Sequence, residues 1–532
     1  MSKATVKIEK KYLVFPVGNH DFIPNRKVKL FCGGELVFDF DAPVDYYDPR
    51  FNVFVDVSEY IGRELDVEIN ISKEFENVQS DEKYYREAQI AHFRPKLHFT
   101  ADFGWLNDPN GLVKYTSKRT GKTLWHMFFQ HNPYDTRWGN MSWGHCVSED
   151  LIHWTQREIA LHPDKFGTMY SGSAIVDHDN LSGLKDGEED PILLFYTAAG
   201  SNNELSASQP FTQCLAYSTD GGESFVKYAN NPIVPHIAGA NRDPKVVFCD
   251  ELGCFIMALY LEGNDYALLR SSDLIKWTQF QRITMADDSE CPDFFPAEVS
   301  GEQNERVWVL RGAGHHYMIF CFNEVSGKFD VIQDSEKHFY SNSYASQTFF
   351  CDENRRISMS WENGLRFPDS AFMSQISYPS VLSVKKEDGK YLLCSNPVAE
   401  FDALGGRSST YGAISLSPGE SSIFDLPDDV HDIRAEIPDN DAKLELSLFG
   451  NSFMLDFAGG NIICGNNTLP ILYKNCGRIR FIIDTCSCTF VVGDGRLGAT
   501  VSFVCDYNIN TLVIRSDKDA FIDRLDIRRI DI

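Results

Sequence analysis

Three acidic residues in the middle of the chain stand in settings that could support acid–base and nucleophilic chemistry. Asp108 lies in GWLNDPNG, Asp243 lies in ANRDPKVVF beside Arg242, and Glu290 lies in DSECPDFFP before an apolar Phe pair. Cleavage of a glycosidic bond needs two carboxyl groups in different protonation states. One attacks or activates water, and the other protonates the leaving oxygen. These residues are therefore candidates for glycoside cleavage.

Each candidate also has an ordinary structural interpretation. Asp-Pro-Asn-Gly is a common turn, and Asp108 is expected at a strand-to-turn junction. Asp243 could form a simple surface pair with Arg242, and Glu290 could be a loop glutamate satisfied by its neighbours. The Cys-Pro and Phe pair after Glu290 instead favour a partly desolvated carboxyl, which suits a general acid.

The elements that must position these residues are predicted to be almost entirely β-strands. Short apolar runs such as FNVFVDV, PILLFYT and CFIMALY alternate with turn-forming segments. The segments SEDLIHWTQ (148–156), YSTDGGESFVKY (217–228) and RSSDLIKWTQF (270–280) form a loose repeat, which is typical of β-propeller blades. The remainder of the chain after about residue 385 is typical of a β-sandwich. The alternative is one large irregular all-β domain.

Two segments break the β pattern. EYIGREL and the charged run at 72–88 are the best candidates for a helix or a linker, and the charged run also marks a domain boundary. We expect a small N-terminal β-domain at 1–88, a central domain at 89–385 and a C-terminal sandwich at 386–532.

Charge and composition exclude several classes of function. The 532 residues include 50 Lys and Arg against 76 Asp and Glu, giving a formal net charge of -26. Such a surface repels phosphate backbones and anionic lipids, so nucleic acid and membrane partners are not expected. No apolar stretch reaches the length of a transmembrane helix, and no secretory signal is recognisable, which predicts a cytoplasmic protein.

Cysteine use predicts neither disulfides nor a metal site. The 14 cysteines are scattered from Cys32 to Cys505 and are expected to be reduced and buried. Cys486 and Cys488 form a CxC pair, but no second Cys or His pair stands at ligand spacing. We expect no metal and no cofactor. The sequence leaves open whether the protein forms a homo-oligomer.

The segment FRPKLHFTADFGWLNDPNGLVKY (93–115) closely resembles the opening of the catalytic domain in glycoside hydrolase family 32, the invertase, inulinase and levanase family. The resemblance continues in order through FFQHNP (128–133), WGNMSWGH (138–145), YSGSA (170–174), RDPKV (242–246), ECPDFF (290–295) and YASQTF (344–349). It implies a five-bladed β-propeller with a central active site, followed by a β-sandwich. The N-terminal unit resembles the small β-domain that precedes some bacterial levanase-type members.

The resemblance also implies a role for each matched residue. Asp108 corresponds to the nucleophile, Asp243 to the stabiliser of the transition state and Glu290 to the acid/base. The matched substrate-binding residues are Asn107, Gln130, Trp138, Tyr170, Ser171 and Arg242. Trp361 is a weaker candidate for the pocket rim, where core packing is an equal alternative.

The implied activity is retaining hydrolysis of terminal, non-reducing β-D-fructofuranosyl units from sucrose, fructo-oligosaccharides or fructans. A fructosyltransferase on the same scaffold and a non-catalytic fructan-binding protein are the alternatives. The chain departs from the family pattern at a few positions. Tyr170 stands where the family usually has Phe, and Asn342 or Ser343 stands where an aspartate commonly precedes Tyr-Ala. Cys486 and Thr489 replace a usual serine and glutamate, and the segment after Trp361 is unlike most relatives.

Overall fold

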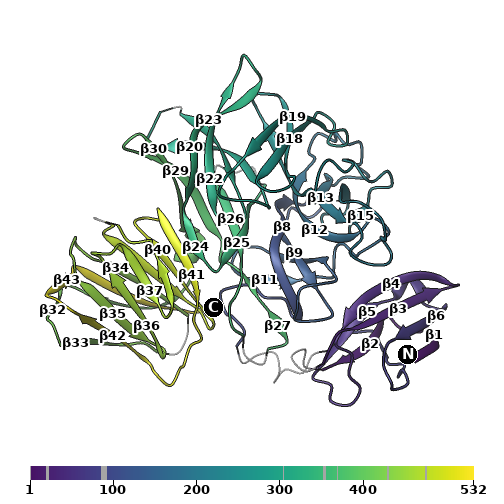
Figure 1. Ribbon diagram of the computed structural model, residues 1–532, viewed down its shortest axis with the longest axis horizontal. Coiled ribbons are helices and arrows are strands. Elements are labelled where there is room, and N and C mark those ends of the chain that lie inside the picture. The colour runs from purple at the N-terminus through teal and green to yellow at the C-terminus, as the bar shows by residue number, and fades with distance from the viewer. Residues whose placement is uncertain are drawn as a thin grey trace.

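The protein is described by a computed structural model, which covers residues 2–18, 23–84, 93–303, 305–350, 355–367, 370–427, 430–473 and 476–532. Within these ranges nearly all regular structure is β-strand, as the sequence predicts. Figure 1 shows a small N-terminal unit, a large central part and a C-terminal unit as neighbouring bodies. No helix in the described ranges has both the length and the apolar character needed to cross a membrane.

The N-terminal unit consists of two small antiparallel sheets that pack around one apolar core. In β3, the alternating residues Val28, Leu30 and Cys32 are buried, as expected for a strand with one face on the core. One sheet has the order β1-β6-β3-β4 and the other β5-β2-β7. The strands are β1 (Ser2–Lys7), β2 (Tyr12–Val17), β3 (Arg26–Cys32), β4 (Glu35–Ala42), β5 (Phe51–Asp56), β6 (Glu64–Ile69) and β7 (Gln79–Ser80).

The first three units of the central part each contain four consecutive antiparallel strands, and a later strand adds to the first unit in parallel. The first unit contains β8 (Gly104–Thr116), β9 (Thr123–Asn132), β10 (Ser142–Ser148) and β11 (Trp154–Gln156). The second contains β12 (Thr168–Val176), β13 (Ile192–Ala199), β14 (Thr212–Ser218) and β15 (Val226–Lys227). The third contains β16 (Arg242–Cys249), β17 (Cys254–Tyr260), β18 (Asp265–Ser271) and β19 (Thr278–Thr284).

Two further units join through a short parallel pairing of β20 with β29. The fourth contains β20 (Asp293–Ser300), β21 (Arg306–Arg311), β22 (His316–Asn323) and β23 (Lys328–Lys337). The fifth contains β25 (Ser343–Thr348), β26 (Arg356–Glu362), β29 (Ser380–Glu387) and β30 (Lys390–Pro397). Two short strands also pair in this region. β27 (Phe372–Met373) pairs with β8 of the first unit, and β28 (Gln375–Ile376) pairs with β26. The first strands of successive units contact one another, and β25 contacts β8. The all-β arrangement is consistent with a propeller.

The sequence repeat corresponds to one recurring turn between the third and fourth strands of the first three units. In each turn a serine hydroxyl donates to an aspartate two residues later, at 3.1, 2.6 and 3.1 Å for Ser148–Asp150, Ser218–Asp220 and Ser271–Asp273. Each aspartate then accepts backbone N–H groups of the following residues. The repeat is therefore a real structural repeat, as predicted.

The C-terminal unit has a larger sheet of order β24-β41-β40-β39-β34-β44-β31 and a six-stranded sheet of order β33-β42-β35-β36-β37-β38, which share one apolar core, as in a sandwich. The larger sheet contains β24 (Phe339–Ser341), β31 (Gly406–Tyr411), β34 (Val430–Glu436), β39 (Arg478–Ile483), β40 (Ser487–Val492), β41 (Leu497–Ser502) and β44 (Arg524–Ile530). The smaller contains β33 (Ser421–Asp425), β35 (Lys443–Leu448), β36 (Asn451–Asp456), β37 (Asn461–Cys464), β38 (Asn467–Leu469) and β42 (Thr511–Ser516). A separate pair joins β32 (Ile414–Leu416) to β43 (Ala520–Ile522).

The helix expectations are wrong in the described residues. EYIGREL contributes only to a short 3-10 turn, η1 (Ser58–Tyr60), and to the start of β6. The charged run contains no helix up to residue 84, and its end, with the expected boundary at 88/89, lies outside the described residues. The expected boundary at 385/386 falls inside β29, which still pairs with β30. A four-residue helix, α2 (Ala399–Asp402), follows β30.

Candidate active site

A pocket of about 390 Å³ opens where the first strands of the units meet. All ten residues predicted for catalysis or substrate binding line it. The lining residues are Asn107, Asp108, Gln130, Trp138, Tyr170, Ser171, Phe211, Ala240, Arg242, Asp243, Glu290, Cys291, Tyr344 and Trp361. The structure therefore brings together side chains that are far apart in the sequence.

Asp108 lies inside β8, at an irregularity in the strand, and not at the strand-to-turn junction expected from Asp-Pro-Asn-Gly. The pairing with β9 shifts between Leu106 and Pro109, as in a β-bulge. A proline is tolerated there because the bulge removes the need for its missing N–H. The Asp108 carboxylate accepts hydrogen bonds from Asn107 Nδ2 at 3.0 Å and from Ser171 Oγ at 2.6 Å. These bonds fix the direction in which it faces the pocket.

Asp243 lies at a similar irregularity in β16, where the pairing with β17 shifts between Arg242 and Lys245. Its φ angle is 65°, in the left-handed region that residues other than glycine seldom adopt, and its side chain lines the pocket. Its backbone N–H donates to Thr197 Oγ1 at 2.9 Å, which ties the bulge to the neighbouring unit. The Asp243 side chain is almost completely buried.

Glu290 immediately precedes the fourth unit, and it also has a positive φ angle of 58°. One carboxylate oxygen pairs with Arg242 Nη2 at 2.5 Å, and the other accepts a hydrogen bond from Tyr344 Oη at 2.8 Å. The Glu290 side chain remains 33% exposed. It is thus partly desolvated, as expected, yet accessible from the pocket.

Cys291 lies between the other two carboxylates. Its Sγ is 3.7 Å from Asp108 Oδ2 and 3.5 Å from Asp243 Oδ2, and its backbone N–H donates to Asp243 Oδ2 at 3.0 Å. Since Cys291 directly follows Glu290, all three acidic residues meet around one point of the pocket. This concentration of negative charge can stabilise a positively charged transition state.

Burial and the neighbouring carboxylates change the pKa values of Asp108 and Asp243. Burial raises the pKa of Asp108, and the charge of Glu290 adds to this, while the Ser171 and Asn107 hydrogen bonds favour the ionised form. Burial also raises the pKa of Asp243 to about 7, with Arg242 opposing and the charge of Asp108 adding. For Arg242, burial alone would lower the pKa, but Asp243 and Glu290 outweigh it and keep the guanidinium charged.

The raised pKa of Asp243 predicts a pH-dependent cost in stability. In the unfolded chain this carboxyl ionises near pH 4, but in the folded protein only near pH 7, so its contribution makes unfolding easier as pH rises through this window. Asp243→Asn should therefore raise Tm relative to the parent at pH 8, and by less at pH 5. Calorimetry at both pH values checks this, with the exposed Asp179→Asn as the control. A Tm difference that is the same at both pH values would contradict it.

Aromatic side chains form one wall of the pocket. Trp138 is 54% exposed and packs edge-to-face on Tyr170, with ring centroids 6.1 Å apart. Tyr170 makes a similar contact with Phe211 at 5.6 Å. On another side, Trp361 lines the pocket but also packs against Trp105 and partly against an apolar core, so it occupies both of its expected positions.

Gln130 is buried, and its Nε2 has no hydrogen-bond partner in the structure although it lines the pocket. A buried donor without a partner is costly, so this amide is available for a ligand oxygen.

Four pocket residues are absent from the sequence-based set: Phe211, Ala240, Cys291 and Tyr344. Cys291 and Tyr344 lie within the matched motifs ECPDFF and YASQTF, which were the available signals. Phe211 lies outside every motif, and Ala240 lies in ANRDPKVVF but two residues before the matched motif RDPKV.

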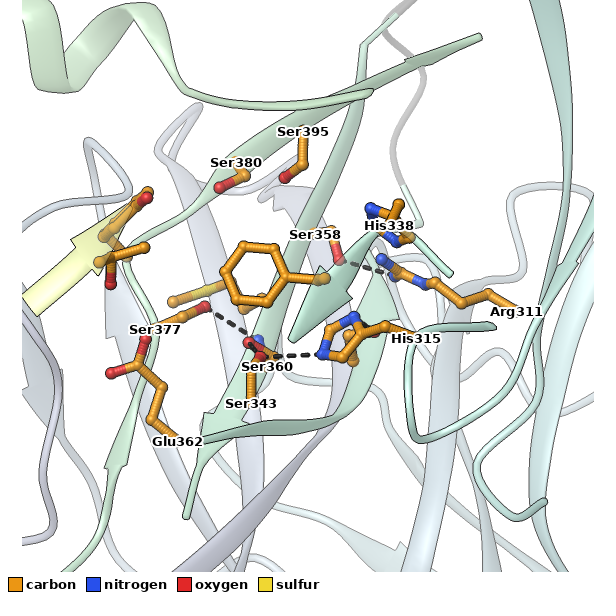
Figure 2. A pocket seen from close by; sticks show the side chains of 15 residues that line it. Arg311, His315, His338, Ser343, Ser358, Ser360, Glu362, Ser377, Ser380 and Ser395 are labelled. Carbon is orange, nitrogen blue, oxygen red and sulfur yellow. Dashed lines mark hydrogen bonds between the residues drawn. The ribbon is translucent and has the colours of Figure 1, made fainter. Parts of the chain in front are cut away.

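A second polar cavity does not compete as the site. Figure 2 shows it lined by Arg311, His315, His338 and a group of serines, with Glu362 at one edge. Its volume of about 30 Å³ has room for only about two water molecules. Ser343, one of the two residues at the expected aspartate position, lies here and donates to Ser360 Oγ at 2.8 Å. Thr489 also lines this cavity, so two of the departures concern internal packing.

Cys486, another departure, is buried, and its Sγ donates weakly to the carbonyl of Phe93 at 3.6 Å. No group of three or more potential metal ligands occurs among the residues that the structure describes.

A model of the glycosyl hydrolases family 32 N-terminal domain matches residues 98–397, which include all three carboxylates. The chain belongs to glycoside hydrolase family 32. It is 31% identical over 384 residues to a levanase of Bacillus subtilis (strain 168), a match that covers 67% of this chain and 54% of the levanase. It is 34% identical over 302 residues to an invertase of Debaryomyces hansenii, covering 52% of this chain and 53% of the invertase. The family 32 chain thus spans about half the length of these relatives.

Solved structures share the fold at low sequence identity. An exo-inulinase from Aspergillus awamori has a TM-score of 0.70 and 21% identity, covering 82% of this chain and 98% of that one. A β-fructofuranosidase from Schwanniomyces occidentalis complexed with fructosyl-erythritol has a TM-score of 0.71, 22% identity and the same coverage. The family 32 chain therefore has the fold of these proteins.

Proposed function

We propose that this protein is a retaining β-fructofuranosidase that removes terminal, non-reducing β-D-fructofuranosyl units from sucrose, fructo-oligosaccharides or fructans. The observation that carries the proposal is the meeting of Asp108, Asp243 and Glu290 around Cys291 in one pocket of a family 32 chain. The named relatives, a levanase and invertases, support this class of substrate.

In the proposed mechanism, Asp108 attacks the anomeric carbon of the fructosyl unit while Glu290 protonates the departing oxygen. Glu290 then removes a proton from the water that hydrolyses the fructosyl-enzyme ester, as a retaining mechanism requires. Tyr344 and Arg242 hold the Glu290 carboxyl in place, and the serine and amide bonds to Asp108 direct its free lone pair. Asp243 stabilises the oxocarbenium-like transition state.

The proposed sugar-binding shell uses the remaining pocket residues. Arg242 and Asp243 bind ring hydroxyls, and Asn107 and Gln130 supply amide hydrogen bonds. Trp138 provides an apolar wall, while Tyr170, Ser171 and Trp361 complete the pocket.

We further propose that the five central units are the blades of one propeller around this pocket. Contacts between successive first strands, including β25 with β8, support this arrangement. We place the boundary to the sandwich after Pro397, where pairing in the fifth unit ends, with the N-terminal domain before the segment at 85–92.

A product profile tests the function directly. Incubation with sucrose, an inulin-type oligosaccharide and levan should release free fructose as the main product. Chain-lengthened products at high sucrose concentration would instead identify a transferase. Binding of these sugars without any cleavage would identify a binding protein and overturn the proposal.

A further inference from the structure

The N-terminal unit forms hydrogen bonds with the segment of the pocket rim that carries Trp138. The Asn140 side chain pairs with the backbone of Asp41 in β4, accepting from its N–H at 2.9 Å and donating to its carbonyl at 2.8 Å. On the other side of Trp138, Arg137 Nη2 donates to Asn25 Oδ1 at 2.6 Å. The exposed tryptophan is therefore held between two contacts to the N-terminal unit.

The same unit also holds the loop at 200–209. The backbone N–H of Glu204 donates to Asp39 Oδ2 at 2.5 Å, and the Glu204 carboxylate pairs with Lys29 Nζ at 2.6 Å. The Asp39 side chain is completely buried in this contact. Within the loop, the backbone N–H and the hydroxyl of Ser206 both donate to Asn203 Oδ1. The loop is therefore compact, and the contacts of Glu204 with the N-terminal unit also constrain the residues next to it.

Both held segments converge on Tyr170. Trp138 packs edge-to-face on its ring, and Asn202 Nδ2 donates to its hydroxyl at 3.4 Å. This hydroxyl exists only because Tyr replaces the phenylalanine usual at position 170. Because Trp138 and Asn202 are exposed, they form the outer part of the wall, away from the carboxylates.

An apolar contact anchors the same face of the N-terminal unit. The rings of Phe40 and Tyr134 lie 4.3 Å apart, and Tyr134 belongs to the core of the N-terminal unit although it lies in the central part of the chain. Figure 1 shows β4 next to the units that contain β8 to β15. The contact is thus a packed interface and not a set of isolated surface pairs.

We propose that the N-terminal unit is a positioning element for substrate selection: it fixes the outer wall formed by Trp138, Tyr170 and Asn202, which contacts sugar units beyond the terminal fructosyl residue. This inference rests on the proposed function. Asn25, Lys29 and Asn140 are the positioning residues, since they touch the wall segments and line no part of the pocket. Loosening them weakens recognition of long fructosides more than of sucrose, whose leaving group is a single sugar.

The test is a triple variant, Asn25→Ala, Lys29→Ala and Asn140→Gly. Glycine is used at 140 because Asn140 has a φ angle of 48°, which alanine would strain. Relative to the parent, kcat/KM on a four-unit inulin-type oligosaccharide should fall about tenfold, mainly through KM, with less than about a twofold change on sucrose. Lys7→Ala, on the opposite edge strand β1, is the matched control, and Lys29→Arg should retain the parent ratio.

The outcomes separate this inference from the function on which it rests. An unchanged ratio between the two substrates overturns the positioning role, and so does an equal loss on both together with a lower Tm, which indicates only a structural role. If the parent enzyme cleaves neither substrate, the proposed function itself fails.

Discussion

Replacing Asp108 with asparagine should lower kcat on sucrose by about four orders of magnitude or more, because the variant has no carboxylate to form the fructosyl ester. Asparagine keeps the shape of the side chain and can still contact Asn107 and Ser171, so the fold should be preserved. The initial rate of fructose release and the Tm measure the two effects separately.

The matched control is Asp179→Asn, which removes an exposed carboxylate from a surface turn and should retain the parent rate. Activity of the Asp108 variant within about tenfold of the parent would show that another group attacks the sugar. A large fall in Tm would point instead to a folding defect, and Asp108→Glu, which keeps the charge but moves it, would then be the deciding variant.

Replacing Glu290 with alanine should lower kcat on sucrose by about a thousandfold, since a glucose leaving group departs poorly without a proton. The loss in kcat/KM, which reports the first step, should be equally large on sucrose but much smaller for a fructosyl donor such as β-fructofuranosyl fluoride, whose leaving group needs no protonation. On the fluoride kcat should fall, because the second step has lost its general base. Azide should then accelerate turnover and yield a fructosyl azide, because this anion attacks the ester without a general base.

Glu298→Ala is the control for Glu290, as it removes an exposed glutamate from β20 in the same segment. Equal losses of kcat/KM on sucrose and on the fluoride would contradict the acid role, because they would place Glu290 in binding or folding only. The same result would leave Asp108 and Asp243 as the assigned catalytic groups.

The residues that line the site were largely predictable from short sequence motifs. The roles of Asp108, Asp243 and Glu290 followed from the family resemblance of their short motifs. The bulges at Asp108 and Asp243 and the positive φ angles at Asp243 and Glu290 were not predicted. The Ser–Asp turn repeat was predictable, since its hydrogen bonds join residues two positions apart.

Features that depend on packing between distant segments were not predictable. Tyr344 reaches Glu290 only because separate units place their first strands side by side, and Phe211 reaches Tyr170 only because the second unit brings the start of β14 near β12. The hydrogen bonds between the Asn140 side chain and the Asp41 backbone join residues 99 positions apart, and no local pattern marks them. EYIGREL was misjudged because the pairing of β6 with β1 and β3 outweighs a weak helical pattern.

The central claim is that Asp108 becomes covalently attached to the sugar, and mass spectrometry of a trapped intermediate tests it most directly. The Glu290→Ala variant is incubated with β-fructofuranosyl fluoride, denatured in acid and digested. We expect the peptide that contains Asp108 to gain the mass of one fructosyl unit, and expect no gain when Asp108→Asn is added to the same variant. Release of fluoride without a label on any peptide, or a label on a different residue, would contradict the account.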